Sequence, residues 1–311
     1  MKSSTLFVLI LATLVLLLAA GCGGGGSSVA VTQPGASGVP VLSHVIIVVG
    51  ENHGYSSVVG NPSMPYFNGL VSQGGLATQY FANTHPSLPN YFVLTTGENI
   101  ALDDSFTGTV TDDNVVRQLL SAGKTWKMYA ESLPSPAYLG GSTGNYSQDH
   151  NPFSFFSDIV NDPAQAANIV PFSQFSADLA GGELPNYSFV VPNQVDNAHN
   201  CPAGLDICDD SQKLAAFDGW LQTNIQPLLD SSSFKASGLL VVLFDEADDL
   251  DISHGGGRIP MLIMSPKAKV NYKSTTVYQH QSTLRLSLEA LGVHAIPGGG
   301  ETAPDMAEFF Q

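Results

Sequence analysis

The chain contains few basic residues and few charges of any kind. Lys and Arg together number 11 against 27 Asp and Glu, the net charge is −16, and charged residues make up only 12% of the chain. A protein that binds duplex or single-stranded nucleic acid needs a basic surface to neutralise phosphates. We therefore expect no nucleic-acid partner. An anionic substrate would need a metal ion or backbone amides to neutralise it.

Long apolar runs are scarce, and the most extended one lies at the N-terminus. Residues 6–20 are almost wholly apolar, but this run is short for a membrane span and follows the single positive charge of Lys2. This layout is typical of a secretory signal. The sequence Leu-Ala-Ala-Gly before Cys22 resembles a bacterial lipobox, in which the Cys is lipidated; an ordinary cleaved signal is the alternative. We expect a lipoprotein signal peptide at 1–21 and an exported protein held to the membrane through Cys22. A flexible Gly/Ser linker is expected at 22–40.

Cysteine is rare as well, with only three residues in the chain. If the signal accounts for Cys22, Cys201 and Cys208 remain. In an exported protein such a pair favours a disulfide that closes a small loop. Zinc binding is less favoured, because no second Cys or His pair has matching spacing.

Residues 41–311 contain no visible repeat of 20–50 residues. This region is long enough to form one large domain with a full hydrophobic core. Strand-like and helix-like segments alternate along it, which predicts an α/β fold with helices on both faces of a mostly parallel central sheet, a three-layer α/β/α arrangement. Pro227 is expected to end the helix predicted at 211–226. The expected strands are 44–49, 77–82, 125–130, 187–191, 238–244 and 260–264, and the expected helices are 64–73, 114–122, 153–161, 211–226 and 279–291.

Two apolar strands each run directly into a pair of oxygen-bearing side chains. Residues 44–50 precede Glu51 and Asn52, and residues 238–244 precede Asp245 and Glu246. Continuous apolar runs are typical of buried parallel strands, and ligands bind beyond the carboxyl ends of such strands. The four side chains therefore suggest a site for a hard cation. The alternative is that Glu51 and Asp245 are N-caps of following helices.

Another polar segment surrounds Ser87, which lies between Pro86 and Pro89. The prolines restrict the backbone, so the hydroxyl is held in a stiff turn. A hydroxyl held in this way beside a cation is a candidate activated nucleophile. Alternatively, Ser87 caps a helix that starts near Pro89.

Two further loops carry polar residues that suit a phosphate or metal site. Asp196 and His199 are three residues apart and can share one metal if the backbone turns, although such pairs also occur by chance in surface loops. His254 is followed by three glycines and Arg258. The glycines let the backbone approach an anion, and the Arg fork suits phosphate. A mobile surface turn with an exposed charge is the alternative.

Taken together and in this order, these segments resemble the phosphoesterase family of bacterial phospholipases C and secreted acid phosphatases, within the alkaline phosphatase-like superfamily. The resemblance spans essentially the whole region after the linker. It rests on Val45-Ile-Ile-Val-Val-Gly-Glu-Asn52, Thr84-His-Pro-Ser-Leu-Pro-Asn-Tyr91, His150-Asn-Pro-Phe153, Pro192 through His199, Phe244-Asp-Glu-Ala-Asp248 with His254 through Pro260, and His280 through Glu289.

The resemblance implies a metal-dependent hydrolase that works through a phosphoserine on Ser87, although Thr84 is an alternative nucleophile. Asn90, His150 and Arg258 are then expected to bind substrate. A divalent cation is expected at Glu51, Asn52, Asp245 and Glu246. On the opposite side, Asp196, His199 and His254 would hold a second metal or supply a general acid, and the sequence does not choose between one metal and two.

The most similar branch is the acid phosphatases, which act on phosphomonoesters. Phospholipase members are commonly longer, and here residues 53–56 replace a longer family stretch, which leaves substrate contacts near His53 open. The alternatives are a phospholipase C-like phosphodiesterase and, more remotely, a non-enzymatic surface binding protein on the same fold. The latter would tolerate loss of Ser87 and Asp245.

Overall fold

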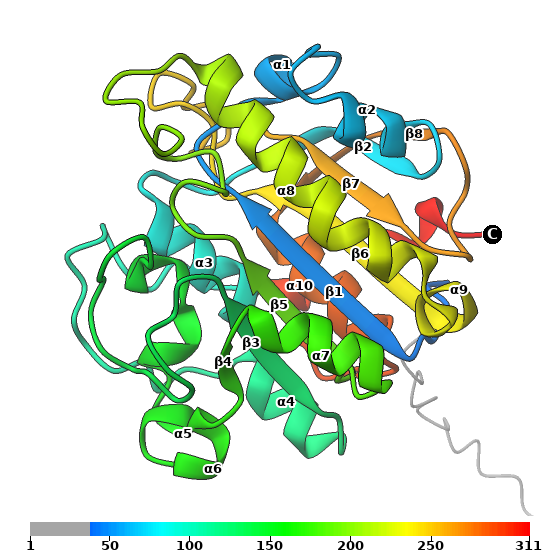
Figure 1. Ribbon diagram of the computed structural model, residues 1–311. Coiled ribbons are helices and arrows are strands. Elements are labelled where there is room, and N and C mark those ends of the chain that lie inside the picture. The colour runs from blue at the N-terminus through cyan, green and yellow to red at the C-terminus, as the bar shows by residue number, and fades with distance from the viewer. Residues whose placement is uncertain (1–37) are drawn as a thin grey trace, which may run out of the picture. The chain divides into compact units, whose positions relative to one another are not determined.

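The computed structural model describes residues 38–311, so the expected signal peptide, the lipid anchor at Cys22 and nearly all of the linker lie outside the described residues. The central feature is an eight-stranded sheet with the order β4-β3-β5-β1-β6-β7-β2-β8 (Figure 1). Only β7 runs antiparallel to its neighbours within this sheet. The strands are β1 (His44–Gly50), β2 (Gly75–Phe81), β3 (Trp126–Ala130), β4 (Ile169–Pro171), β5 (Tyr187–Val191), β6 (Gly238–Phe244), β7 (Met261–Met264) and β8 (Tyr272–Gln279).

Helices cover both faces of the sheet. In Figure 1, α7, α8 and α9 lie in front of it and α3, α4 and α10 lie behind it, which confirms the expected three-layer α/β fold. None of the helices among residues 38–311 has the length and apolar character needed to cross a membrane. The helices are α1 (Tyr55–Val58), α2 (Pro65–Val71), α3 (Ser87–Thr96), α4 (Val115–Ser121), α5 (Ser157–Val160), α6 (Pro163–Ala166), α7 (Ser173–Gly181), α8 (Asp210–Asp230), α9 (Ser232–Ser237) and α10 (His280–Glu289), with 3-10 turns η1 (Gln148–His150), η2 (Pro152–Phe155), η3 (Gly298–Gly300) and η4 (Ala307–Phe309).

The centre of the sheet positions the site. Strands β1 and β6 are adjacent and parallel, and nearly every residue in both is buried, as their continuous apolar sequences require. Their register pairs Gly50 with Phe244, so the residues that follow, Glu51 and Asp245, lie side by side at the carboxyl edge. A hydrogen bond from the Asp245 amide to the Gly50 carbonyl continues the ladder one step beyond the strands.

Several elements differ from the sequence-based prediction. Strand β8 was missed because it is an edge strand in which exposed polar residues interrupt the apolar pattern, and β4 is only three residues long. The expected helix at 153–161 is divided into η2 and α5. The prediction that Pro227 ends its helix was wrong: α8 continues to Asp230, because burial of Leu228 offsets the hydrogen bond that proline cannot donate.

Candidate active site

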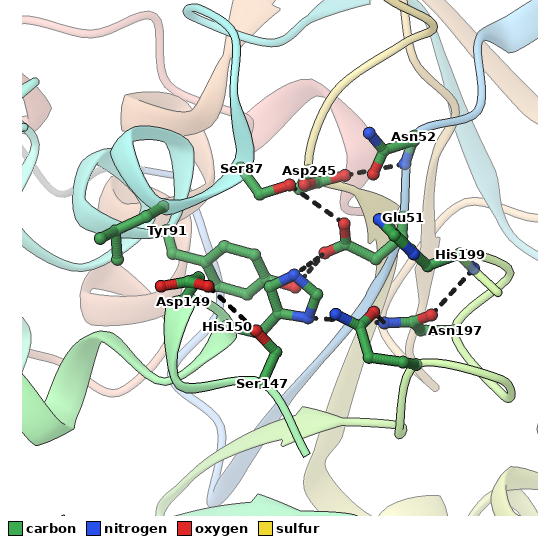
Figure 2. Close-up of polar contacts among 12 residues, drawn as sticks. Glu51, Asn52, Ser87, Tyr91, Ser147, Asp149, His150, Asn197, His199 and Asp245 are labelled. Atoms are coloured by element: carbon green, nitrogen blue, oxygen red, sulfur yellow. Dashed lines mark hydrogen bonds and ion pairs between the residues drawn. The ribbon is translucent and has the colours of Figure 1, made fainter. Parts of the chain in front are cut away.

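Three donors converge on the buried carboxylate of Glu51 (Figure 2). The Tyr91 hydroxyl donates to Oε1 at 2.7 Å, and the Nε2 atom of His150 lies 3.3 Å from the same oxygen. The Ser87 hydroxyl donates to Oε2 at 3.1 Å. Since the Asn197 amide Nδ2 faces His150 Nδ1 at 3.5 Å, the proton of a neutral His150 belongs on Nε2, where it points at Glu51. The carboxylate is therefore fixed in orientation from two sides.

Ser87 occupies the first residue of α3, and Tyr91 follows one turn later on the same face. This spacing explains why both hydroxyls reach Glu51. The amino end of a helix carries unpaired backbone N–H groups and a partial positive charge, which favour a bound anion. A phosphate at Ser87 would meet that charge.

The loop before Ser87 is fastened by the side chain of Asn90. Its carbonyl oxygen accepts hydrogen bonds from the amides of Asn83 and Thr84, at 3.0 and 3.2 Å. Its Nδ2 group donates to the Thr84 carbonyl at 2.7 Å and lies 3.2 Å from Glu246 Oε2. Asn90, which we predicted to bind substrate, thus also holds the turn before Ser87 against Glu246, which follows strand β6.

Asn52 is oriented by the residues that follow β6. Its backbone amide donates to Asp245 Oδ1 at 3.0 Å, and its Nδ2 donates to Glu246 Oε1 at 3.0 Å. Asn52 has a φ of 51°, in the left-handed region that few residues other than glycine and asparagine adopt. Because Nδ2 is taken by Glu246, the carbonyl oxygen Oδ1 is the atom left to bind a ligand.

The backbone of Asp245 is anchored from α10. His280 Nε2 lies 2.6 Å from the Asp245 carbonyl oxygen, and its Nδ1 lies 3.1 Å from the Tyr80 hydroxyl, which in turn contacts Thr283. Nε2 must donate to the carbonyl, so Nδ1 accepts the tyrosine proton. Burial lowers the pKa of His280 to about 4. A neutral, fully buried histidine therefore holds this ligand residue in place.

The electrostatics of the site are dominated by three crowded carboxyl groups. Burial, followed by the charge of Asp245, raises the pKa of Glu51 well above its usual range. Burial also raises the pKa of Asp245, and burial together with the Asp245 charge raises that of Glu246 to about 10. Within residues 38–311, neither Lys nor Arg forms an ion pair with any of the three. Within the described residues, no Lys or Arg therefore balances the charge of these carboxylates.

The donor atoms fit a hard divalent cation. Asn52 Oδ1 and Asp245 Oδ2 are buried without a hydrogen-bond partner in this structure, a costly arrangement for polar atoms. Ser87, Glu51 and Asp245 point toward one another in Figure 2. Carboxylate, amide and hydroxyl oxygens of this kind are the ligands that Mg²⁺, Ca²⁺ and Mn²⁺ prefer.

His85 is a site residue that the sequence analysis did not assign. Its Nε2 lies 3.1 Å from the Asp251 carbonyl, so Nε2 carries the proton, and Nδ1 faces Glu246 Oε2 at 3.2 Å. His85, Glu246 and Asp249 form a group whose ligand atoms lie within 4.8 Å of one another. Tyr91 was likewise not assigned, although its spacing from Ser87 on a helix was visible in the sequence.

The side chains of four other predicted site residues have no hydrogen bond or ion pair with this cluster within the described chain, although the His199 backbone amide donates to Asn197 at 2.9 Å (Figure 2). Asp196 accepts a hydrogen bond from Asn193 at 2.9 Å, and His199 is exposed. Burial, followed by the charge of His199, lowers the pKa of His150 to about 3. His254 is exposed and packs against Phe81, with ring centroids 4.0 Å apart and the rings tilted by 36°. The Arg258 guanidinium donates to the Thr78 carbonyl at 2.8 Å and lies 3.8 Å over the Tyr55 ring. Their predicted roles stay predictions.

The loop after β5 contains the expected cross-link. Cys201 and Cys208 form a disulfide, with their Cα atoms 5.6 Å apart, so the predicted pairing is confirmed. Nearby, His53 is buried and its Nδ1 donates a 2.7 Å hydrogen bond to the Glu51 carbonyl, while its Nε2 lies 3.8 Å from Asp210. His53 therefore supports the backbone of Glu51.

Comparison with solved structures defines the class of fold. A protein of the alkaline phosphatase superfamily from Vibrio parahaemolyticus superposes with a TM-score of 0.61 at 16% identity, covering 86% of this chain and 72% of that one. The murine ectonucleotide pyrophosphatase/phosphodiesterase 5 superposes with a TM-score of 0.55 at 11% identity. This superposition covers 86% of this chain and 100% of that one. The fold is therefore that of the alkaline phosphatase superfamily.

Sequence comparison narrows the class to a family. The model of the Phosphoesterase family matches residues 61–293. The phosphatidylinositol-3-phosphatase of Mycobacterium tuberculosis is 36% identical over 70% of this chain and 69% of its own length. A probable acid phosphatase of Kluyveromyces lactis is 31% identical over 78% of this chain. The matched region spans 56% of the length of that relative. This chain belongs to the Phosphoesterase family and is a phosphoric ester hydrolase, as the sequence motifs predicted.

Proposed function

We propose that the protein hydrolyses phosphomonoesters, with Ser87 as the nucleophile beside a divalent cation. The observation that carries this proposal is the Ser87 hydroxyl, which donates to Glu51 Oε2 at the amino end of α3, next to buried carboxyl groups that lack a Lys or Arg partner in the described chain. The names of the relatives, acid phosphatase and phosphatidylinositol-3-phosphatase, both denote enzymes that remove a phosphate monoester, and they support this preference.

Glu51, Asn52, Ser87 and Asp245 would hold the cation. Glu246 belongs to the same predicted ligand set, and its two oxygens receive the amide groups of Asn52 and Asn90, so it also orients those side chains. When bound, the cation would neutralise phosphate oxygens and lower the pKa of the serine hydroxyl. This is how an acidic protein with few basic residues can attract a phosphate ester.

In the first chemical step, Ser87 Oγ attacks phosphorus, the bond between phosphorus and the ester oxygen breaks, and the alcohol leaves. The serine proton has an acceptor in Glu51 Oε2, 3.1 Å away. The departing oxygen needs a proton, for which His199 is the predicted general acid; its backbone amide donates to Asn197, whose side chain faces His150. The backbone N–H groups at the start of α3 favour the charge on phosphate.

In the second step, water attacks the phosphoserine, the bond between phosphorus and Oγ breaks, and inorganic phosphate leaves. Glu51 returns the proton to Ser87 Oγ and His199 takes a proton from the attacking water, so the enzyme returns to its starting state. Positioning and charge stabilisation supply most of the catalysis in reactions of this type. Tyr91 and His150 contribute by holding Glu51 against Ser87 in both steps.

The test is hydrolysis of p-nitrophenyl phosphate and bis-p-nitrophenyl phosphate by the wild type, with and without a chelator, over a range of pH. Ser87→Ala is compared with Thr84→Val, because Thr84 is the alternative nucleophile in the same turn and its hydroxyl donates to the His85 carbonyl. We expect Ser87→Ala to lose monoester turnover by about a thousandfold or more and Thr84→Val to retain most of it.

Three outcomes would contradict the proposal. Full activity in the Ser87→Ala variant would remove Ser87 as the nucleophile, and full activity after exhaustive chelation would remove the cation. A marked preference for the diester would favour the phospholipase C-like alternative. Capture of phosphate on Ser87 by mass spectrometry after rapid quenching would support the covalent step directly.

We also infer from the N-terminal sequence that the protein is exported and lipid-anchored through Cys22, a membrane-anchored lipoprotein at the periplasmic or cell surface. Metabolic labelling with palmitate in a bacterial host tests this inference. Label on the wild type and none on Cys22→Ala is the expected result. Secretion of an unlabelled, soluble wild type would contradict it.

A further inference from the structure

The four most exposed large hydrophobic side chains in residues 38–311 belong to only three loops. Leu102 is 93% exposed, Leu250 is 92%, Ile207 is 89% and Ile252 is 73%. Single exposed aliphatic residues are ordinary, but side chains that project almost fully into water and gather on one edge mark an interaction surface. We call these four residues the aliphatic rim.

Each of the three loops is attached to the active site by a contact of its own. Two residues after Leu102, the Asp104 carboxylate accepts a hydrogen bond from the Leu88 amide at 2.9 Å, directly beside Ser87. Between Leu250 and Ile252, the Asp251 carbonyl lies 3.1 Å from His85 Nε2. These two loops therefore border the Ser87 turn.

The third loop is closed by the Cys201–Cys208 disulfide, which carries Ile207 next to the cross-link. Asp210, just beyond it, lies 3.8 Å from His53, whose ring contacts the Glu51 carbonyl. The three loops that carry the rim residues are thus tied to the Ser87 turn and to the backbone of Glu51, at the carboxyl edge of the sheet.

We propose that the aliphatic rim docks on a lipid surface, so that the active site takes the phosphate of a lipid head group directly from a membrane. This inference rests on the proposed function, because it assigns the rim to presenting substrate to Ser87. A phosphate on a lipid head group lies within reach of a membrane surface, where aliphatic side chains on either side of the site can insert among the acyl chains. The relative that hydrolyses a phosphatidylinositol phosphate, by its name, has a substrate of this kind.

The charges around the rim specify the kind of membrane. The three segments 98–107, 201–210 and 247–257 contain no Lys or Arg, and they carry the carboxyl groups of Glu98, Asp103, Asp104, Asp206, Asp209, Asp210, Asp248, Asp249 and Asp251. An anionic bilayer would repel such loops, whereas basic residues are what attract proteins to anionic lipids. The rim therefore fits a surface of zwitterionic lipid in which the phosphorylated lipid is a minor component.

The experiment compares the full-length wild type with the variant Leu250→Ser/Ile252→Ser and the control Val270→Ser. Val270 is 67% exposed and lies between β7 and β8, at the opposite edge of the sheet. All three proteins also carry Cys22→Ala, so that no lipid at Cys22 holds them to the vesicles and binding reports on the rim. Two substrates are used: a short-chain phosphatidylinositol phosphate below its micellar concentration and a long-chain one in phosphatidylcholine vesicles. Vesicle co-sedimentation is measured in parallel.

We expect the Leu250→Ser/Ile252→Ser variant to lose vesicle binding and kcat/KM on the vesicle substrate by about tenfold or more, since two large aliphatic side chains no longer insert. Its activity on the short-chain substrate should stay within about twofold of the wild type, as should both activities of Val270→Ser. Replacing phosphatidylcholine with phosphatidylserine should weaken wild-type binding at low salt.

Unchanged vesicle binding and vesicle activity in the rim variant would overturn the docking surface while leaving the phosphatase proposal intact. Equal loss on both substrates would also overturn it, because the substitutions would then act on the site itself. A wild type that binds vesicles but hydrolyses neither substrate would instead count against the proposed function. Failure of the wild type to bind vesicles, with retained turnover of the soluble ester, would point to a protein or peptide partner for the rim.

Discussion

Two carboxylates of this protein accept hydrogen bonds from tyrosine and serine hydroxyls, and their pKa values move in opposite directions. Glu51 receives the hydroxyls of Tyr91 and Ser87, whereas Glu308 receives those of Tyr272, Ser274 and Tyr278. Burial, reinforced by the adjacent Asp245, raises the pKa of Glu51 well above its usual range. At Glu308 burial also acts upward, but hydrogen bonds from the three hydroxyls outweigh it and lower the pKa to about 2.

The pKa values of Glu51 and Glu308 differ because of the residues around each carboxylate, since both accept hydrogen bonds from hydroxyl groups. The hydrogen-bond partners of Glu308 are neutral hydroxyls, which tie the C-terminal turn η4 to the edge strand β8. Glu51 shares its buried environment with Asp245 and Glu246, and Asn52 Oδ1 and Asp245 Oδ2 have no hydrogen-bond partner among residues 38–311. A carboxylate satisfied by neutral donors stabilises the fold, whereas a cluster that the fold leaves uncompensated is suited to a cation.

Asp245→Asn gives the largest expected effect and separates the two clusters most clearly. Activity on p-nitrophenyl phosphate should fall by about a thousandfold or more, because a ligand charge is lost. In the presence of chelator, the free energy of unfolding should rise by about 1 kcal/mol, since one buried charge is removed while Oδ1 still accepts the amides of Asn52 and Glu246. Turnover assays and urea denaturation measure both quantities. A chelated variant less stable than the wild type would show that the cluster is compensated within the protein.

Metal addition should produce the next largest effect. A divalent cation at about 100 times its Kd should raise the free energy of unfolding of the chelator-treated wild type by about 2.7 kcal/mol. Asp245→Asn should lose most of this gain, whereas Glu308→Gln should keep it, because Glu308 lies outside the cation cluster. Denaturant titrations with Mg²⁺, Mn²⁺ and Ca²⁺ test the prediction. An equal gain in both variants would move the binding site elsewhere.

Tyr91→Phe tests how much the hydroxyl donors to Glu51 contribute to catalysis. Removing the 2.7 Å hydrogen bond to Glu51 should lower kcat by about tenfold with little change in KM, because Glu51 loses a fixed orientation. Tyr129→Phe is the matched control, since the Tyr129 hydroxyl donates at 2.6 Å to Asp178, a carboxylate outside the site. The control should lower stability and leave kcat unchanged. Equal kcat values for the two variants would contradict a positioning role for Tyr91.

Glu308→Gln should have the smallest effect, and that effect should depend on pH. At neutral pH we expect a loss of about 1 kcal/mol of stability, kept modest by solvent screening. The native pKa of about 2 lies below the ordinary value of 4.5, so the stabilisation is complete above about pH 4.5 and disappears as pH falls through about 2. Urea denaturation of wild type and variant from pH 2 to 7 measures this difference. A difference that grows on acidification would reverse the sign and contradict the assignment.

Several features of the site were predictable because they depend on local sequence and on one general rule of parallel sheets. The runs before Glu51 and Asp245 are continuously apolar, which fits strands buried on both faces, and the carboxyl ends of such strands share one edge. The prolines around Ser87 and the three-to-four spacing of apolar residues in α8 are local signals of the same kind. The short spacing between Cys201 and Cys208 likewise allowed their disulfide to be predicted.

Other features required the folded chain. Whether Asp196, His199 and His254 face the nucleophile depends on how long loops pack, and no spacing along the sequence encodes the packing of His254 against Phe81 or the hydrogen bond from Arg258 to Thr78. The roles of His85 and His280 arise from contacts with residues more than 30 positions away. The mostly polar pattern of β8 conceals a strand that only its parallel pairing with β2 reveals.

The sequence by itself determined the layered α/β fold, the two ligand strands and the nucleophile turn, because apolar periodicity and backbone restriction act over a few residues. Only the tertiary structure decided which carboxylates are compensated and which are not. Glu51 and Glu308 are both acidic residues with hydroxyl donors, and nothing in their local sequence distinguishes them. Burial and the proximity of Asp245, which comes from a strand far along the chain, separate their pKa values, because desolvation and charge repulsion depend on distance in space.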